Sequence, residues 1–263
     1  GGYNAKIYDI EDLEDQFAFG IRNHPLSIKN FLRYARDRFS VKPQFVFLIG
    51  HGLTFNNTYG ANGAIADYQS QALVPTYGYP ASDILLASDN FTPIAATPIG
   101  RLSAATPAEV GAYLDKIKTY EKAQNNTDHS IDNNAWKKNI AYVSGGANAT
   151  EADQFDKVLK NYSQIMSDTL FGGSGYYFSN NSTTFGTSGN SDLNSLFSQG
   201  LALVSYYGHG ASTSIGYLQL GDPDNFTYND KYPLIFISGC DVGNCFDYME
   251  NRVNTLNNIT EKF

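Results

Sequence analysis

Basic clusters and long apolar runs are both missing from this sequence. Charged residues make up 17% of the 263 positions, and 18 Lys and Arg stand against 26 Asp and Glu, so the formal net charge is −8. An acidic chain without Lys/Arg clusters argues against nucleic acid or an anionic membrane as its main partner. No apolar run approaches the ~20 residues that span a bilayer, so we expect no transmembrane segment.

Cysteine is also scarce. The two cysteines, Cys240 and Cys245, are five residues apart and follow a predicted strand, so a disulfide between them would close a very small loop. A disulfide scaffold is therefore excluded, and we expect both thiols to be reduced. With 42% hydrophobic residues, a chain of this length can instead build a substantial core.

Predicted strands alternate with predicted helices along most of the chain, which indicates an α/β fold with doubly wound, mostly parallel sheets and helices on both faces. Uninterrupted apolar runs are typical of strands that are buried on both faces of a parallel sheet. Such strands are expected at 45–49, 139–144, 176–178, 201–207 and 232–238, and helices at 25–38, 107–122, 150–169 and 191–199. Thr106 and Thr150 are the expected N-caps of two of these helices.

A polar stretch rich in Asn and Asp, residues 123–135, is the best candidate for a linker. We therefore expect two α/β subdomains, residues 1–130 and residues 131–263. The chain begins with Gly1 and Gly2 rather than Met, and it ends 23 residues after Cys240 (263 − 240). These features suggest a fragment of a larger chain, in which later elements would cover the edge of the second sheet.

Reactive side chains follow two consecutive predicted strands. The run 201–207 leads into Gly208-His209-Gly210, and the run 232–238 leads into Gly239-Cys240. If the strands are parallel neighbours, imidazole and thiol emerge at the same edge of the sheet, as a nucleophile with its base. Glycine lets the main chain approach a substrate closely, so Gly210 and Gly239 are expected to bind substrate, with the amides of Gly210 and Cys240 facing the oxyanion.

Less specific interpretations stand beside these. A histidine at a strand end often bonds to the backbone, and a cysteine is often a buried, inert thiol. His51 repeats the Gly-His-Gly pattern and is expected to be a turn or pocket residue. Three loop aspartates could ligate a structural Ca²⁺, although turn chemistry explains them equally well. They are Asp222, Asp224 and Asp230.

Several sequence blocks follow one another in a specific order. They are Ile7-Tyr8-Asp9, Phe31-Leu32-Arg33-Tyr34-Ala35, Leu48-Ile49-Gly50, Ser82-Asp83, Gly100-Arg101-Leu102, Lys118-Thr119-Tyr120-Glu121, Tyr207-Gly208-His209-Gly210 and Ser238-Gly239-Cys240-Asp241-Val242-Gly243. Their order resembles the gingipain branch of the caspase-like cysteine peptidases (clan CD), which includes the sortase of the bacterial type IX secretion system. The blocks cover nearly the whole chain.

The resemblance implies a caspase-like fold in two subdomains, with His209 as general base and Cys240 as nucleophile. It also implies an acidic residue from the first subdomain beside them. Asp83 is the candidate to orient His209, and Asp89 is the second. No cofactor is required by this chemistry.

The implied function is that of a cysteine endopeptidase or a sortase-type transpeptidase that acts on secreted proteins through a thioacyl-enzyme. For the sortase, the resemblance implies removal of a C-terminal sorting domain and attachment of the cargo to a surface lipid sugar. It places the chain in a member of the Bacteroidota, secreted or on the cell surface in association with the outer membrane. The implied partners are polypeptide substrates and outer-membrane secretion proteins.

A different class of function stays open, in which the peptidase-like fold serves as a catalytically silent binding or structural component of a surface secretion complex. The long polar loop at 54–80 and the early end of the chain motivate it. A dinucleotide-binding protein is less favoured, because no Gly-x-Gly-x-x-Gly joins a strand to a helix.

Overall fold

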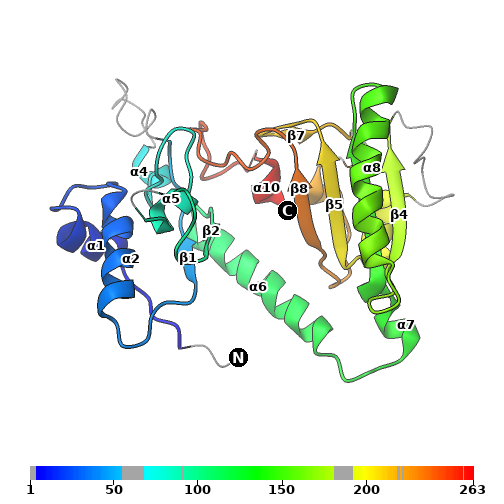
Figure 1. Cartoon of the computed structure of the whole chain (residues 1–263), viewed down its shortest axis with the longest axis horizontal. Helices are drawn as coiled ribbons and strands as arrows, with labels where there is room; N and C mark the ends of the chain where they lie inside the picture. The colour runs from blue at the N-terminus through cyan, green and yellow to red at the C-terminus, as the bar shows by residue number, and fades with distance from the viewer. Residues whose placement is uncertain are drawn as a thin grey trace. The chain divides into compact units, whose positions relative to one another are not determined.

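The computed structural model describes residues 4–54, 68–89, 92–180, 192–217, 220, 222–256 and 258–263. Most of the polar loop expected at 54–80 therefore lies outside the described residues, since 55–67 are among those left out. The chain forms two compact units, coloured along the sequence in Figure 1. The first comprises Gly1–Val110 with Cys245–Leu256, and the second comprises Gly111–Asn244 with Asn257–Phe263.

The first unit is built on two parallel strands with helices beside them. Its elements are α1 (Ile10–Phe17), α2 (Leu26–Arg38), β1 (Val46–Ile49), α4 (Tyr68–Gln71), α5 (Ile84–Ala87), β2 (Ile99–Leu102) and the start of α6 (Pro107–Gln124). β1 pairs with β2 from Val46 opposite Ile99 to Ile49 opposite Leu102. The buried residues Ile28 and Leu32 of α2 pack with Leu48 and Leu86, which joins helix to sheet in one hydrophobic core.

The C-terminal segment 245–256 returns to this first unit. The Arg252 side chain is fully buried there and donates to both carboxylate oxygens of Glu109, at 3.1 and 3.0 Å, and to the carbonyl oxygen of Ser103 at 2.9 Å. The amide of Gln71 donates to the carbonyl oxygen of Met249 at 2.7 Å. These bonds tie residues that are more than a hundred positions apart in sequence.

The second unit holds a sheet of four parallel strands in the order β4-β3-β5-β8. Its elements are the rest of α6, α7 (Ile131–Asn134), η1 (Ala135–Lys138), β3 (Asn139–Gly145), α8 (Ala149–Met166), β4 (Ser174–Ser179), α9 (Leu193–Gln199), β5 (Leu203–Gly208), β6 (Gly210–Ala211), β7 (Ser214–Ile215), η3 (Pro223–Asn225), β8 (Leu234–Ser238) and α10 (Ile259–Lys262).

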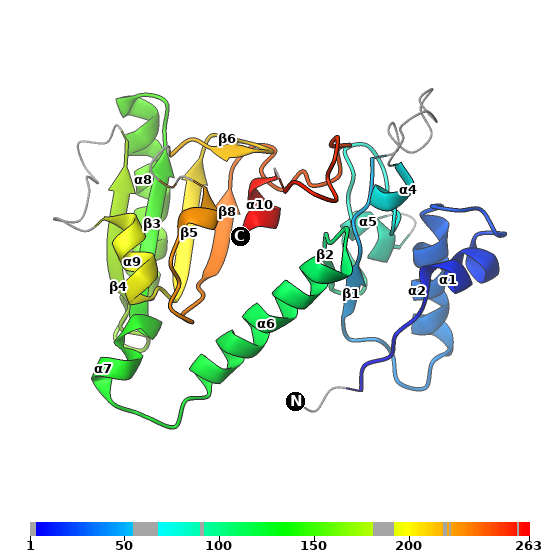
Figure 2. The ribbon, with the colours of Figure 1, turned by 180° about the vertical axis from the view of Figure 1, so that it is seen from behind.

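Helices cover both faces of this sheet. α8 lies over the face turned to the viewer in Figure 1, and α9 lies over the opposite face, which Figure 2 shows. On the α9 side the core contains Val143, Phe197 and Val204, and on the α8 side it contains Tyr142 and Leu159. The predicted α/β class, with parallel strands and helices on both faces, is confirmed.

Several details differ from the expectations. The boundary between the units falls within α6, after Val110, rather than near residue 130, so the polar stretch 123–135 that was expected as the linker lies inside the second unit. The N-cap of α8 is Asn148, whose side chain accepts the N–H of Glu151, and not Thr150. Strand β8 is the edge of the described sheet and is only partly buried, with Leu234 65% and Phe236 54% exposed.

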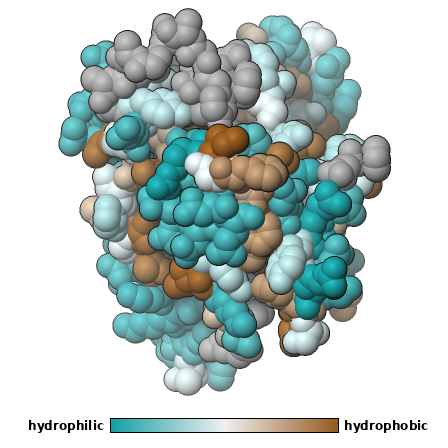
Figure 3. All heavy atoms as spheres, turned by 90° about the vertical axis from the view of Figure 1, so that its left-hand side faces the viewer, coloured by the Kyte–Doolittle hydropathy of each residue, from teal (hydrophilic) through white to brown (hydrophobic). Residues whose placement is uncertain are grey.

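The surface on the side of α1 and α2 is mostly hydrophilic, with hydrophobic residues scattered through it (Figure 3). Phe19, just after α1, is 91% exposed. Single exposed apolar residues are normal on soluble proteins and need no partner. Among the described residues, no helix is long and apolar enough to cross a membrane.

Candidate active site

The predicted pairing of the two strands that carry histidine and cysteine is confirmed. β5 and β8 are parallel neighbours, with Tyr207 opposite Ser238. The next residues continue side by side, since a Cβ added to Gly239 would lie 3.1 Å from the carbonyl oxygen of Gly208. His209 and Cys240 thus follow adjoining strands at the carboxyl edge of the sheet, where open α/β sheets bind their ligands.

Cys240 is a free and exposed cysteine. It begins a turn directly after β8, in which Asp241 has a φ of 61°, in the left-handed region. Cys245 forms no disulfide either, but it is partly buried and lies in the segment that returns to the first unit. Cys240 is therefore the more accessible of the two cysteines, and its thiol is the one that a ligand at the edge of the sheet could reach.

His209 is held from two sides. Its side chain is 53% exposed, and its Nε2 lies 2.9 Å from Oε2 of Glu151. The ring of Phe155 packs edge-on against the imidazole, with 5.7 Å between the ring centroids. On the backbone, the N–H of His209 donates to the carbonyl oxygen of Gly145 at 3.0 Å.

Glu151 lies in the first turn of α8 and fits its site for local reasons. Its backbone N–H donates to the side chain of the N-cap residue Asn148, and its own side chain accepts the N–H of Ala147 at 3.1 Å, a variant of the capping box displaced by one residue. The hydrogen bond from His209 lowers the pKa of Glu151, and the bond from Ala147 adds to this effect. A carboxylate at a helix N-terminus is also favoured by the helix dipole.

The carboxylate partner of His209 in this structure is therefore Glu151, where the sequence analysis expected Asp83 or Asp89. Asp83 instead accepts two bonds from Arg101, at 2.8 Å to Nε and 2.7 Å to Nη2. Asp89 pairs with Arg36 at 2.8 Å. Both of these ion pairs lie within the first unit, whereas His209 and Glu151 belong to the second. The expected role of Asp83 stays a prediction.

The signal for Glu151 was present in the sequence. The pattern Asn148-x-x-Glu151 directly before an amphipathic helix is a capping-box signature, and the strand that precedes it, β3, is the neighbour of β5. Position 151 follows the carboxyl end of β3, at the same edge of the sheet as His209. The resemblance implied an acidic residue from the first subdomain, so Glu151 was not among the expected site residues.

Gly210 opens a short hairpin in which β6 pairs with β7, with Gly210 opposite Ile215. A Cβ on Gly210 would lie 3.1 Å from the carbonyl oxygen of Cys240 and 2.3 Å from a methyl carbon of Val242. Only glycine allows the two backbones to approach so closely. The two residues expected to provide oxyanion donors therefore have adjoining main chains.

The second Gly-His-Gly motif has a structural role. His51 is completely buried in the first unit, and its Nδ1 lies 2.8 Å from the carbonyl oxygen of Gln71. Burial lowers its pKa, so the imidazole is neutral near neutral pH. This agrees with the expected turn or pocket residue.

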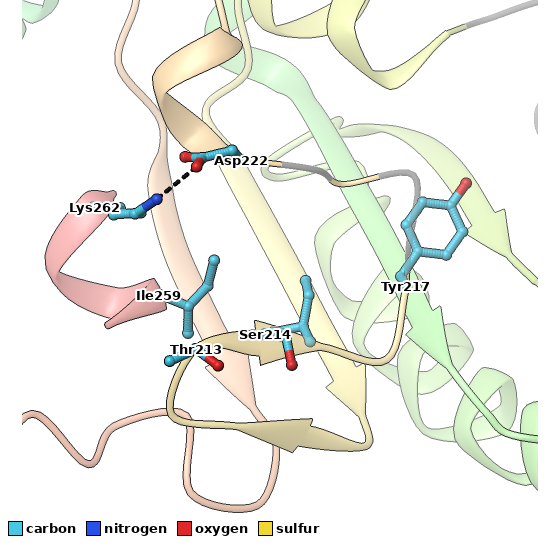
Figure 4. A pocket seen from close by; sticks show the side chains of 7 residues that line it. Thr213, Ser214, Tyr217, Asp222, Ile259 and Lys262 are labelled. Carbon is cyan, nitrogen blue, oxygen red and sulfur yellow. Dashed lines mark hydrogen bonds and ion pairs between the residues drawn. The ribbon is translucent and has the colours of Figure 1, made fainter. Parts of the chain in front are cut away.

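A small hollow of about 240 Å³ lies in the second unit and is shown in Figure 4. The ion pair between Lys262 and Asp222 borders it, so Asp222 already has a cationic partner. Neither His209 nor Cys240 lines it. The residues that do are Thr213, Ser214, Ile215, Tyr217, Asp222, Ile259 and Lys262.

No group of three or more His, Cys, Asp or Glu side chains suited to a metal ion occurs in the part of the chain that the structure describes. The Ca²⁺ suggested for the loop aspartates stays a prediction.

An exposed free thiol and a carboxylate-linked imidazole at adjoining ends of parallel strands are the elements of a cysteine peptidase site. The sequence profile of Peptidase family C25 matches residues 2–263. The chain therefore belongs to Peptidase family C25, in agreement with the resemblance drawn from its sequence blocks.

Solved structures share the fold of this chain. A complex of the pro- and mature domains of RgpB from Porphyromonas gingivalis is 15% identical and matches with a TM-score of 0.55, over 96% of this chain and 55% of its own. Gingipain R (RgpB), described as an Arg-specific cysteine proteinase, is 18% identical with a TM-score of 0.56, over 92% and 54% of the two chains. A third, described as a protease, is 19% identical with a TM-score of 0.61, over 85% and 44%.

At these identities the likeness concerns the fold, and the chain spans about half the length of the structures that it matches. A search of curated proteins found no match.

Proposed function

We propose that this chain carries the nucleophile and general base of a cysteine peptidase, with Cys240 and His209 in these roles. The observation that carries the proposal is the register of β5 and β8, which places both residues at one edge of the sheet. Membership of Peptidase family C25 supports the same reaction class.

In the proposed reaction, the imidazole accepts the proton of the Cys240 thiol, and the sulfur attacks the carbonyl carbon of a peptide bond. Because Nε2 of His209 faces Glu151, the other ring nitrogen, Nδ1, is the one assigned to the thiol. A C–S bond forms, and the carbonyl oxygen becomes an oxyanion facing the amides of Gly210 and Cys240. The C–N bond then breaks, and the leaving amine takes the proton from the imidazolium.

The resulting thioacyl-enzyme is resolved by a nucleophile that attacks the same carbonyl carbon. Water gives hydrolysis, and an amine gives transpeptidation, with the Cys240 thiol regained in both cases. The sequence resemblance to the type IX secretion sortase favours an amine acceptor at the cell surface, substrates that carry a C-terminal sorting domain, and outer-membrane secretion partners. These finer assignments, including an extracellular location, are part of the proposal.

An electrophilic peptide probe, such as a peptidyl acyloxymethyl ketone, tests the assignment. We expect it to label the full protein and Cys245→Ala, but not Cys240→Ala. Equal labelling of Cys240→Ala would overturn the assignment of the nucleophile. A wild type that is folded and stays unlabelled across probes with basic, acidic and apolar P1 residues would favour the silent binding component instead.

Adding an amine acceptor separates the two peptidase reactions. The test uses a peptide substrate with a glycine-based or amino-sugar acceptor. A transpeptidase forms an amide whose mass equals the mass of the N-terminal cleavage product, as the free acid, plus the mass of the acceptor minus one water. Hydrolysis product alone, at saturating acceptor, would contradict the transpeptidase proposal.

A further inference from the structure

The hydroxyl of Tyr206 lies against the backbone of the proposed active site. Tyr206 is in β5, three residues before His209, and only 1% of it is exposed. Its hydroxyl donates to the carbonyl oxygen of His209 and accepts the N–H of Gly216 at 2.8 Å. The same N–H also points at the carbonyl oxygen of His209, at 2.7 Å. The buried hydroxyl of Tyr206 thus connects the backbone of His209 to that of Gly216, the residue after β7.

The glycines around this phenol show how closely the site is fitted to it. A Cβ on Gly145 would lie 1.9 Å from the Tyr206 oxygen, and Cβ atoms on Gly208 and Gly216 would lie 2.7 and 3.0 Å from it. Real Cβ atoms essentially never approach within 3.0 Å of another heavy atom, so Gly145 and Gly208 accept only glycine while Tyr206 is present, and at Gly216 the backbone oxygen of Gly145, at 2.8 Å, adds to the crowding. They come from β3, β5 and the residue after β7.

The hydrogen bond from Tyr206 to the carbonyl oxygen of His209 also fixes the direction of the Gly210 N–H. The carbonyl of His209 and the N–H of Gly210 belong to one planar trans peptide, so they point in opposite directions. Because the carbonyl faces the buried hydroxyl of Tyr206, the N–H of Gly210 points away from it. The register of the hairpin agrees with this direction. Gly216 donates to His209, so the next pair, Gly210 and Ile215, is a non-hydrogen-bonded pair. The N–H groups of such a pair point away from the partner strand.

A hydrogen bond to a carbonyl also polarises its peptide group and strengthens the N–H as a donor. Burial raises the pKa of Tyr206 to about 12, so the phenol keeps its proton in any ordinary assay. Donation to His209 is therefore constant with pH.

We propose that Tyr206 is a positioning residue for oxyanion stabilisation, whose hydroxyl orients and polarises the peptide between His209 and Gly210. The inference rests on the proposed function, since it concerns the amide of Gly210 as an oxyanion donor. A tyrosine that only fills space would act through its ring, whereas this role needs the hydroxyl. Removing the hydroxyl should weaken steps that develop an oxyanion and spare steps that do not.

Two reagents separate these effects. The Cys240 thiol adds to the carbonyl group of a peptide aldehyde and forms a thiohemiacetal. A C–S bond forms, and the former carbonyl oxygen occupies the position of the oxyanion. Iodoacetamide forms a C–S bond at a saturated carbon with loss of iodide, and no oxyanion develops. The aldehyde is chosen from a set with different P1 residues as the one that binds the wild type most tightly.

For Tyr206→Phe in the full protein, we expect about tenfold weaker aldehyde inhibition, because one neutral hydrogen bond is lost. The iodoacetamide rate at Cys240 should be unchanged. The control is Tyr142→Phe, which removes another hydroxyl of a buried tyrosine from the neighbouring strand β3, in the core on the α8 side of the sheet. It should change neither measurement.

Each outcome decides between the possibilities. Unchanged aldehyde inhibition in Tyr206→Phe, or a parallel fall in aldehyde binding and alkylation, would overturn the positioning role. A wild type that binds no aldehyde would overturn the proposed function together with this inference. If Tyr206→Phe does not fold, 3-fluorotyrosine at position 206 keeps the ring and carries a more acidic hydroxyl. It should then tighten aldehyde inhibition without changing alkylation, and no change would overturn the inference.

Discussion

Oε2 of Glu151 lies 2.9 Å from Nε2 of His209, although 58 residues separate them in sequence. The contact arises because β3 and β5 are parallel neighbours, so residues that follow their carboxyl ends meet at one edge of the sheet. In the proposed peptidase, this carboxylate orients the imidazole and stabilises its protonated form, as the third member of nucleophile–base–acid sites does.

Replacing Glu151 with Gln should lower kcat by at least about tenfold, but by less than the roughly 10⁴-fold loss seen when a buried carboxylate behind a catalytic histidine is replaced, because Glu151 is 37% exposed. KM should change little, because Glu151 is assigned no contact with substrate. Steady-state kinetics on a fluorogenic peptide measure both. Asp89→Asn is the control and should retain full kcat. A normal kcat in Glu151→Gln, with a loss in Asp83→Asn at unchanged melting temperature, would return the role to Asp83.

Replacing Arg252 with Ala should destabilise the protein by about 3 kcal/mol, the lower end of the range for a broken buried ion pair, because the mostly buried carboxylate of Glu109 loses its partner. The Arg252 side chain is 0% exposed and that of Glu109 is 20% exposed. Urea unfolding followed by circular dichroism measures the change. Lys118→Ala is the control, since Lys118 is 72% exposed and its partner Asp115 is 77% exposed, and ion pairs between exposed side chains contribute little to stability. Equal stability of the two variants would contradict the structural role of Arg252.

The pair of Glu109 and Arg252 should also make stability depend on pH in the acid range. Burial alone would raise the pKa of Glu109, but the bonds from Arg252 and from the N–H of Ala105 outweigh it, and the pKa is lowered. A lowered pKa in the folded state stabilises the fold above the unfolded pKa of about 4.3, and this contribution is lost as the pH falls through the folded pKa.

Glu109→Gln should therefore be less stable than the wild type at pH 7, and the difference should shrink on acidification below about pH 4. Melting temperatures across a pH series measure it. A difference that is constant with pH would show that the charge of Glu109 contributes nothing.

Two glycine substitutions should have opposite effects. Gly145→Ala places a Cβ 1.9 Å from the Tyr206 oxygen, so it should lower the melting temperature and also the peptidase activity.

Gly111→Ala lies in α6, where an added Cβ meets no atom within 4 Å, and should stabilise the protein by roughly 0.5–1 kcal/mol. Differential scanning calorimetry compares the two variants, and a harmless Gly145→Ala would mean that Tyr206 can move.

Local pattern was enough to predict the elements that are long and strongly patterned. The apolar runs 201–207 and 232–238 correspond to β5 and β8, and the helix expected from Pro107 corresponds to α6. Thr106 caps α6 as expected, accepting the N–H of Glu109 at 3.3 Å. The short β6–β7 hairpin was not predicted, because two-residue strands leave no periodicity.

The sequence by itself indicated the α/β class and the candidates His209 and Cys240, because apolar runs that end in a glycine turn are local features. The parallel pairing of their two strands was an expectation that the structure confirmed. Only the tertiary structure decided which acid meets the imidazole, since a hydrogen bond between residues 151 and 209 depends on the order of strands in the sheet. It alone also decided that the phenol of Tyr206 supports the backbone of His209 and that residues 245–256 return to the first unit. Contacts between distant segments follow from packing, which no local pattern encodes.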